Sequence, residues 1–261
     1  MIHIICLDYD MTLFDHAANQ IPDSAMKALD SVRDKYKIVL ASGRYFNDTM
    51  NLQAKELIKP DGIVHANGSV VEVGGKILHE AFFDSDLLQS VISFSMEHNL
   101  TVGGLYEGVW YSTKPDQQKE SWLTKGRINV PEVRNIHELL DKKIYSLFLD
   151  DTVETAAFIA EKFPSLRTPI MSEKSGGADI IPIQVSKATG MEILLKHWNM
   201  TFTNVAAVGD SMNDFELVEA AAVGIAMGNA VSRLKEIANF ITTPISEDGI
   251  KNAIEYLESI R

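Results

Sequence analysis

Short apolar runs alternate with longer amphipathic stretches near both ends of the chain. The apolar runs predict strands at Ile2–Leu7, Ile38–Ala41, Gly62–Ala66, Val205–Val208, Val223–Ala226 and Phe240–Ile241. The amphipathic stretches predict helices at about Pro22–Lys35, Tyr45–Ile58, Ser186–Asn199, Ser211–Ala221 and Asp248–Ile260. Because strands that alternate with helices are typical of a doubly wound parallel sheet, we expect an α/β fold.

The pattern between about residues 82 and 181 is different and predicts an α+β module. A helix is expected from Asp84-Ser85 through His98, and another at Val153–Lys162. Strands are expected at Leu100–Leu105, Val109–Tyr111, Lys143–Leu149 and Asp179–Ile181. The sequence therefore predicts a discontinuous core, residues 1–81 plus 182–261, and an inserted domain, residues 82–181.

Two carboxylates follow the first predicted strand, in the segment Asp8-Tyr9-Asp10-Met11-Thr12. The carboxyl end of a central parallel strand is where open α/β sheets bind their ligands. Two carboxylates this close repel each other, and a divalent metal would compensate their charge. Acidic residues after a strand also cap turns, so the pair alone leaves both interpretations open.

The second predicted strand ends in Ser42-Gly43-Arg44. The Ser42 hydroxyl and the backbone N–H groups of Gly43 and Arg44 would face an anion, such as a phosphate, at a helix N-terminus. Ser42 acting only as a helix cap is the alternative. Arg44 either contacts a substrate or pairs with a local carboxylate.

A lysine stands at the start of a later helix, in the segment Val185-Ser186-Lys187. Ser186 is placed to cap that helix, so Lys187 falls in the first turn, where the helix dipole disfavours a cation. Nearby carboxylates and a phosphoryl group would explain this placement. A solvated lysine is the alternative.

The most specific pattern is the buried-type strand Val205–Val208 followed by Gly209-Asp210-Ser211-Met212-Asn213-Asp214. Asp210 falls at the strand end, and Asp214 returns to the same side one helical turn later. Acidic residues at a helix N-terminus explain either aspartate singly. Their paired spacing is typical of a metal site.

Taken in order, these segments resemble the motifs of the haloacid dehalogenase-like phosphohydrolases. The matching residues are Asp8/Asp10/Thr12, Ser42, Lys187 and Asp210/Asp214. The long interval between the second and third motifs resembles the Cof-like subfamily, as do Ala66-Asn67-Gly68 and Ala226-Met227-Gly228-Asn229-Ala230. The resemblance implies a Rossmann-like core with an inserted α+β cap domain that selects the substrate.

The resemblance also implies catalytic roles. Asp8 would attack the phosphoryl group and form an aspartyl-phosphate, and Asp10 would act as general acid and then general base. Mg²⁺ would be held by Asp8, the Asp10 backbone carbonyl and Asp210, with Asp214 as a further ligand or as a support for the ligands.

Contacts to the phosphoryl group would come from Lys187, Ser42, Gly43 and Asn213. Thr12 would steady the loop or the Asp8 carboxylate. The chain departs from the family pattern at Met11, where glycine is commonest. A side chain at this position restricts the turn but does not forbid it, unless φ must be positive.

Composition narrows the possible partners. The 261 residues carry a net charge of −12, which argues against a nucleic-acid or anionic-membrane partner. The single cysteine, Cys6, excludes an internal disulfide, and no apolar run is long enough to span a membrane. We therefore expect a cytoplasmic protein. The resemblance implies a small-molecule phosphate ester as the partner, and we expect a monomer or weak homodimer.

The sequence thus predicts a Mg²⁺-dependent phosphatase that hydrolyses small phosphomonoesters, with sugar phosphates or related metabolites as the expected substrates. A sugar phosphomutase is the nearest alternative, since related capped enzymes return the phosphoryl group to a sugar. A non-catalytic phosphometabolite-binding protein is the alternative outside enzymology. The presence of Asp8, Asp10, Lys187 and Asp210 together argues against a binding protein.

Overall fold

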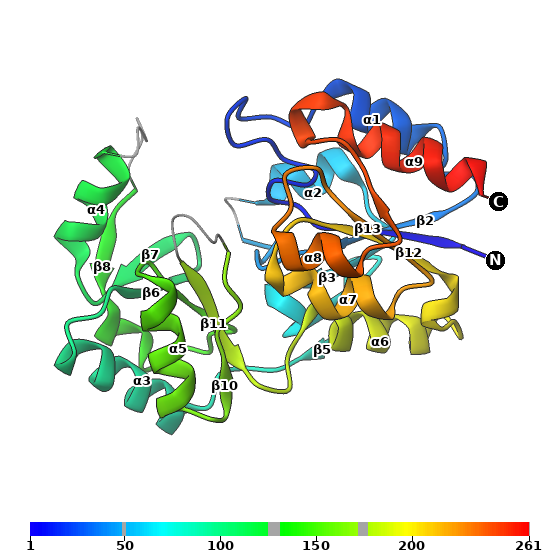
Figure 1. Ribbon diagram of the computed structural model, residues 1–261. Coiled ribbons are helices and arrows are strands. Elements are labelled where there is room, and N and C mark those ends of the chain that lie inside the picture. The colour runs from blue at the N-terminus through cyan, green and yellow to red at the C-terminus, as the bar shows by residue number, and fades with distance from the viewer. Residues whose placement is uncertain (49–50, 125–130, 172–176, 261) are drawn as a thin grey trace. The chain divides into compact units, whose positions relative to one another are not determined.

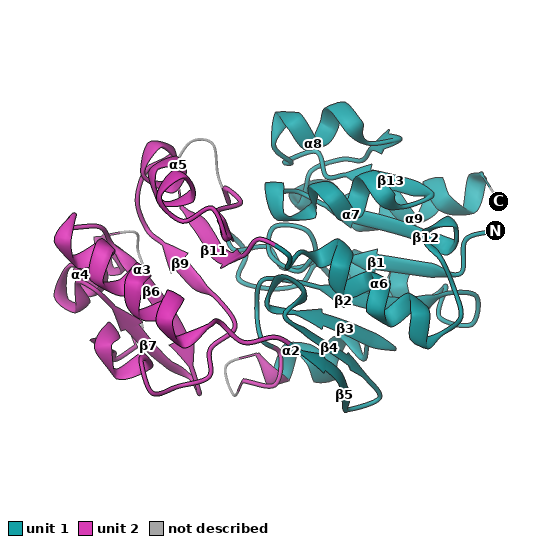
Figure 2. Ribbon diagram, turned by 90° about the horizontal axis from the view of Figure 1, so that it is seen from below, with its two compact units in different colours: residues 1–45, 53–80, 184–261 teal, residues 46–52, 81–183 magenta. Residues whose placement is uncertain are grey.

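The computed structural model describes residues 1–48, 51–124, 131–171 and 177–260, and the chain forms two compact units (Figure 2). The first unit contains Met1–Tyr45, Gln53–Glu80 and Gln184–Arg261, and the second contains Phe46–Leu52 and Ala81–Ile183. The sequence-based division did not place Phe46–Leu52 with the second unit. One reason for this grouping is that the Gly108 backbone N–H donates to Asp48 Oδ2 over 2.7 Å.

The first unit is built on an eight-stranded sheet (Figure 1). In spatial order its strands are β14 (Phe240–Ile241), β13 (Val223–Ala226), β12 (Val205–Gly209), β1 (Ile4–Leu7), β2 (Lys37–Ala41), β3 (Gly62–His65), β4 (Val70–Val73) and β5 (Lys76–Glu80). Strands β14 to β3 are parallel, and β4 and β5 continue the sheet as antiparallel strands. This arrangement confirms the predicted α/β core.

Helices cover both faces of this sheet. They are α1 (Asp23–Asp30), α2 (Leu52–Ile58), α6 (Lys187–His197), α7 (Phe215–Ala220), α8 (Ser232–Ile237) and α9 (Gly249–Ser259), with short 3₁₀ turns η1 (Ala66–Gly68), η3 (Phe202–Asn204), η4 (Met212–Asp214) and η5 (Ile245–Glu247). Helices α1 and α9 pack together on one side of the sheet, and α6 and α7 lie on the other (Figure 1).

Strand β1 lies in the middle of the sheet. Every residue in Ile4–Leu7 is apolar and buried, which suits a strand that is covered by helices on both faces. It pairs with β12 on one edge and β2 on the other, with Leu7 opposite both Val208 and Leu40. Chain connections run outward in opposite directions from this point. It is therefore the topological switch point, where ligands bind beyond the carboxyl ends of the strands.

Two predicted helices are shorter than expected. The helix predicted at Tyr45–Ile58 begins only at Leu52, and residues 49–50 of that range lie outside the described residues. The helix predicted at Pro22–Lys35 ends at Asp30 and continues as turns. In both ranges the apolar spacing is compatible with a longer helix than the one that the backbone forms. Helix ends are the part of an element that sequence patterns locate least well.

The hairpin β4–β5 was not predicted. Its turn is Gly74-Gly75, and both glycines have positive φ. A Gly-Gly pair between two short strands is a hairpin signal. In the sequence, the charged residue Glu72 interrupts the apolar pattern of β4. In the structure Glu72 is buried, and its carboxylate pairs with the Lys55 ammonium over 2.6 Å.

The second unit has a six-stranded sheet with the order β10 (Leu166–Arg167), β11 (Ala178–Pro182), β9 (Leu147–Leu149), β6 (Val102–Tyr106), β7 (Val109–Ser112) and β8 (Val133–Asn135). Its helices are α3 (Ser85–Glu97), α4 (Pro115–Thr124) and α5 (Val153–Lys162), with a 3₁₀ turn η2 (Ile136–Leu139). Helix α3 begins as predicted, because Asp84 accepts a hydrogen bond from the Leu87 N–H. The unit is the predicted α+β module.

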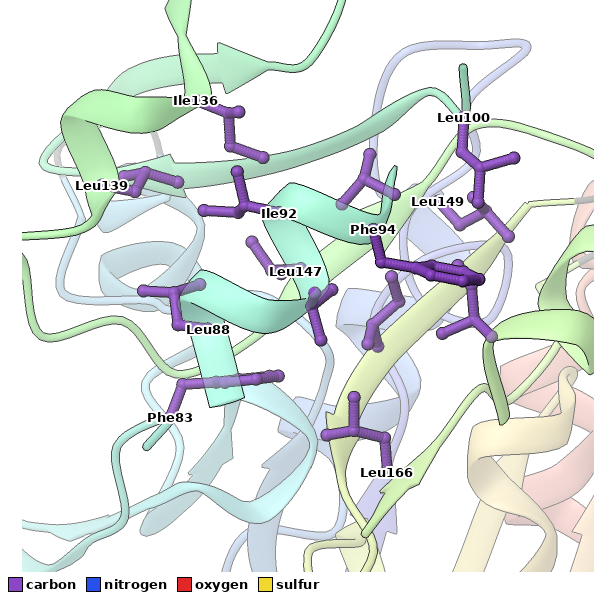
Figure 3. Close-up of a cluster of buried hydrophobic side chains, with 14 of the residues drawn as sticks. Phe83, Leu88, Ile92, Phe94, Leu100, Ile136, Leu139, Leu147, Leu149 and Leu166 are labelled. Atoms are coloured by element: carbon purple, nitrogen blue, oxygen red, sulfur yellow. The ribbon is translucent and has the colours of Figure 1, made fainter. Parts of the chain in front are cut away.

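This unit has its own hydrophobic core, shown in Figure 3. Leu88 and Ile92 on α3 pack with Leu147 and Leu149 on β9. Tyr111 belongs to this core, whereas Trp110 lies against the rings of Trp122 and Phe148. Within the described residues of the chain, no helix combines the length and apolar composition needed to cross a membrane.

Candidate active site

Lys187 connects residues from three motifs that are far apart in the sequence. Its ammonium group donates to Asp8 Oδ1 over 2.6 Å and to Asp214 Oδ1 over 2.7 Å. All three side chains are buried. Asp8 lies at the end of β1, Lys187 opens α6, and Asp214 ends the turn after β12, so the ends of these elements meet at one point.

The start of α6 is fixed by a capping box, and the cation in its first turn is balanced by two carboxylates. Ser186 caps the helix, with its Oγ accepting from the Thr189 N–H and the Thr189 hydroxyl accepting from the Ser186 N–H. Burial alone would lower the pKa of Lys187, but the charges of Asp214 and Asp8 raise it well above its ordinary value. Lys187 is therefore cationic at neutral pH and paired with carboxylates, which is one of the two interpretations that the sequence left open.

Asp214 holds this arrangement together. Its Oδ2 accepts hydrogen bonds from the backbone N–H groups of Asp210, over 3.0 Å, and Ser211, over 3.1 Å. Gly209 makes room for that carboxylate, since a Cβ at position 209 would lie 2.4 Å from Asp214 Cγ. Gly209 is thus required by close packing against Asp214.

The carboxylates of Asp8, Asp210 and Asp214 form an acidic cluster in which one oxygen from each residue lies within 4.8 Å of the other two. Burial, together with the charges of Asp214 and Asp210, raises the pKa of Asp8 well above its ordinary value, although Lys187 opposes this. Burial and the charge of Asp214 raise the pKa of Asp210 to about 7.

The charge balance of this cluster fits a divalent cation. Three carboxylates against one ammonium leave two uncompensated negative charges in a buried site. Oxygen ligands of this kind suit Mg²⁺. Burial and the repulsion between neighbouring carboxylates, which raise the pKa of both Asp8 and Asp210, make the fully ionised cluster unfavourable without a further positive charge.

The structure shows two polar contacts that the sequence did not indicate. The Thr12 hydroxyl donates to Asp210 Oδ1 over 3.2 Å, and so steadies that carboxylate, not Asp8. The Asn213 amide donates to Asn67 Oδ1 over 2.9 Å, and its oxygen accepts from the Ser211 hydroxyl over 2.7 Å. Asn213 is therefore held by neighbours, one of which comes from the Ala66-Asn67-Gly68 segment.

The second motif does not begin a helix, which corrects the expectation of a phosphate at a helix N-terminus. Ser42 and Gly43 lie in a turn after β2, well before α2 begins at Leu52. The buried Ser42 Oγ accepts from the Arg44 backbone N–H over 3.2 Å. The turn is closed by backbone hydrogen bonds from Asn67 to the Ser42 carbonyl and from Ala66 to the Arg44 carbonyl.

Arg44 pairs with a local carboxylate, which is one of the two roles that the sequence left open. Its Nε donates to Asp10 Oδ2 over 2.8 Å, and its Nη2 donates to Asp10 Oδ1 over 2.6 Å. His16 adds a contact of 2.7 Å from Nε2 to Asp10 Oδ1. Burial alone would raise the pKa of Asp10, but His16 and Arg44 hold it well below its ordinary value.

Met11 lies in the left-handed region, with φ of 58°. This is the condition under which the sequence predicted that a side chain at this position would be unfavourable. The Asn229 amide donates to the Met11 carbonyl over 2.8 Å, while Asn229 Oδ1 accepts from the Ile245 N–H over 2.9 Å. Asn229, in the Ala226–Ala230 segment, therefore holds the loop that contains Met11 in this conformation.

We expect Met11→Gly to raise the free energy of unfolding by about 0.5–1 kcal/mol, because glycine relieves a left-handed penalty of about 1–2 kcal/mol and loses part of that gain in chain entropy. Urea unfolding measures the change. Asn19→Gly is the matched control: Asn19 has φ of 51°, and asparagine tolerates this region. A lower stability for Met11→Gly would show that packing of the methionine outweighs the backbone strain.

Comparison with known proteins agrees with this geometry. The sequence model of the haloacid dehalogenase-like hydrolases matches residues 5–254. The chain is 26% identical to the Bacillus subtilis 5-amino-6-(5-phospho-D-ribitylamino)uracil phosphatase YcsE, over 98% of this chain and 95% of the relative. It is 23% identical to Bacillus subtilis phosphatase YwpJ, over 97% of this chain and 99% of the relative.

Solved structures show the same fold. BT1666 from Bacteroides thetaiotaomicron superposes with a TM-score of 0.87 at 23% identity, covering 99% of this chain and 96% of that one. The subclass IIB sugar phosphatase BT4131 superposes with a TM-score of 0.85 at 23% identity, covering 98% and 99%. The match of the family over nearly the whole chain, with Asp8, Asp210 and Asp214 gathered around Lys187, shows that this protein belongs to the haloacid dehalogenase-like hydrolases and is a phosphatase.

Proposed function

We propose that the protein is a Mg²⁺-dependent phosphomonoesterase that acts on small sugar-type phosphates through a phosphorylated Asp8. The observation that carries this proposal is the buried contact of Lys187 with Asp8, inside an acidic cluster that has two uncompensated negative charges. Such a site binds a cation and, with it, a phosphoryl group.

Mg²⁺ would be held by the carboxylates of Asp8 and Asp210 and by the Asp10 backbone carbonyl. When bound, the ion supplies positive charge that reduces the repulsion between the nucleophile and the phosphoryl group. Asp214 supports the site without binding the ion in this proposal, because both of its oxygens already accept hydrogen bonds.

Asp8 is the proposed nucleophile, and Lys187 orients its carboxylate through Oδ1. Asp8 attacks phosphorus while the bond to the leaving oxygen breaks, and Asp10 gives a proton to that oxygen, a step that requires Asp10 to be protonated and thus released from part of its contacts with His16 and Arg44. Asp10 then takes a proton from the water that attacks the phosphorylated Asp8. Ser42, Gly43 and Asn213, with Lys187, are the proposed contacts to the phosphoryl oxygens.

The proposed substrate class is supported by the names of two related proteins. YcsE is named for a ribityl phosphate ester, and BT4131 is named as a sugar phosphatase. A phosphate on a sugar-type chain has an alcohol leaving group, for which an acid such as Asp10 is useful. A phosphomutase would use the same residues and return the phosphoryl group to a sugar.

Phosphate release from a panel of sugar phosphates, nucleotides and an aryl phosphate tests this proposal, with Mg²⁺ and with chelator. We expect release that requires Mg²⁺ and returns when the ion is restored. Isomerised sugar phosphate without net release, dependent on added sugar bisphosphate, would favour the mutase. Full activity in chelator would contradict the assignment of the metal.

A further inference from the structure

The 3₁₀ turn η1, which follows β3, has an unusual backbone. Ala66, Asn67 and Gly68 are all buried and have positive φ, with values of 46°, 58° and 106°. Asparagine and glycine tolerate this region, whereas alanine is disfavoured in it. A backbone of this kind persists only where its surroundings impose it, and such segments cluster at functional sites. The conformation of η1 is therefore set by the segments that it contacts.

Two backbone hydrogen bonds join η1 to the turn after β2. The Asn67 N–H donates to the Ser42 carbonyl, and the Ala66 N–H donates to the Arg44 carbonyl, both over 2.9 Å. Ser42 is one of the proposed contacts to the phosphoryl group. Its position is therefore fixed relative to Asn67.

The other end of η1 lies against the start of α6. A Cβ at position 68 would overlap the Ser186 carbonyl oxygen, so glycine is required where the two segments meet. Ser186 caps α6, and Lys187 follows it in the first turn of the helix. The position of η1 is thus coupled to the helix end that carries the Lys187 ammonium.

The side chain of Asn67 extends these contacts to Asn213, which is partly buried. Asn213 Nδ2 donates to Asn67 Oδ1 over 2.9 Å, and Asn213 Oδ1 accepts from the Ser211 hydroxyl over 2.7 Å. Since Asn67 Oδ1 is an acceptor only, it determines which side of the Asn213 amide carries the nitrogen. An amide nitrogen has two N–H groups, and among the described residues Asn67 is the only acceptor for this one. The second N–H is therefore left for a ligand.

We propose that Asn67 is a positioning residue for Asn213, an inference that rests on the proposed phosphatase function. Asn67 accepts one N–H of the Asn213 amide and so leaves the second N–H to donate to an oxygen of the phosphoryl group. Without this acceptor the amide can turn over and present its oxygen to the negatively charged group. Because η1 also contacts the Ser42 turn and the start of α6, it holds the phosphoryl contacts in one arrangement.

A double-mutant cycle tests this role. Asn67→Gly removes the side chain and places at position 67 the residue that best tolerates φ of 58°, so the η1 backbone is kept. Asn213→Ala removes the proposed phosphoryl contact itself. The quantity compared is kcat/KM for p-nitrophenyl phosphate with Mg²⁺, in wild type, the two single variants and the double variant.

We expect Asn213→Ala to lower kcat/KM about 10–100-fold, as for the loss of a hydrogen bond to a charged group. We expect Asn67→Gly to lower it about 5–10-fold, because the Asn213 amide keeps its contact with Ser211. The double variant should lie within about 2-fold of Asn213→Ala, because no amide is then left for Asn67 to position. A merely structural role of Asn67 would instead make the two losses multiply.

Asn199→Gly is the matched control, since Asn199 is exposed after α6, has φ of 54° and should leave kcat/KM unchanged. Thermal unfolding shows whether each variant is folded. Asn67→Ser, whose side chain stops short of Asn213, replaces Asn67→Gly in the cycle if the glycine variant is unfolded. An unchanged Asn67→Gly enzyme, or losses that multiply in the double variant, would overturn the positioning role. If wild type with Mg²⁺ released no phosphate from any ester of the panel, the proposed function would fail, and the positioning role with it.

Discussion

Asp8→Asn is expected to lower phosphate release by at least about 10⁴-fold, because an amide does not attack phosphorus and removal of a catalytic nucleophile typically costs this much. The fold should survive. The substitution removes one negative charge from a cluster in which burial and neighbouring carboxylates already raise the pKa of Asp8. Lys187 keeps its contact with Asp214. Initial rates with Mg²⁺, together with thermal unfolding, measure both effects.

Asp34→Asn is the matched control, since Asp34 is exposed and lies outside the acidic cluster. It should have the activity of the wild type. An Asp8→Asn enzyme that is folded and retains comparable phosphate release would show that another group attacks phosphorus. An Asp8→Asn protein that is unfolded would show instead that the carboxylate is needed to hold Lys187.

Lys187→Met is expected to lower the free energy of unfolding by about 3–5 kcal/mol near neutral pH, because it leaves buried carboxylates without their cation. Activity should be lost as well. The pKa of Lys187 is raised, so its stabilising contribution is complete below its unfolded pKa and is lost only at strongly alkaline pH.

The deficit of Lys187→Met should shrink as the pH falls below about 7. The pKa of Asp210 is raised to about 7, so its carboxyl takes up a proton in this range, which removes charge that Lys187 balances; the pKa of Asp8 is raised as well, which acts in the same direction. Urea unfolding at several pH values measures the effect. Lys196→Met, on the same helix with a side chain that is 72% exposed, is the control. A deficit that does not depend on pH would indicate lost packing as its main cause.

The central cluster could be predicted from the sequence because parallel strands share one carboxyl edge. Asp8 follows β1 and Asp210 follows β12, and the two strands are neighbours in the sheet. Any sequence with these strand ends brings such residues together. The position of Lys187 at a disfavoured end of α6 added an independent reason to expect carboxylates nearby.

The partners of these residues could not be predicted, because they depend on loop conformations that are set by distant contacts. His16 lies six residues beyond Asp10 and reaches it because the loop turns back. Thr12 contacts Asp210 for the same reason. The apolar spacing after β2 indicated a helix at Tyr45, whereas the chain forms a turn closed by Ala66 and Asn67.

The position of β1 in the sheet also has a consequence for synthesis on the ribosome. One edge of β1 pairs with β2, which follows soon after it in the chain. The other edge can pair only after β12 (Val205–Gly209) has been synthesised. Lys187 and Asn229, which hold Asp8 and the Met11 loop, also emerge late. The second unit can therefore fold before the first unit is closed, and the nascent chain acquires its catalytic arrangement only after the segment from Lys187 to Asn229 has been synthesised.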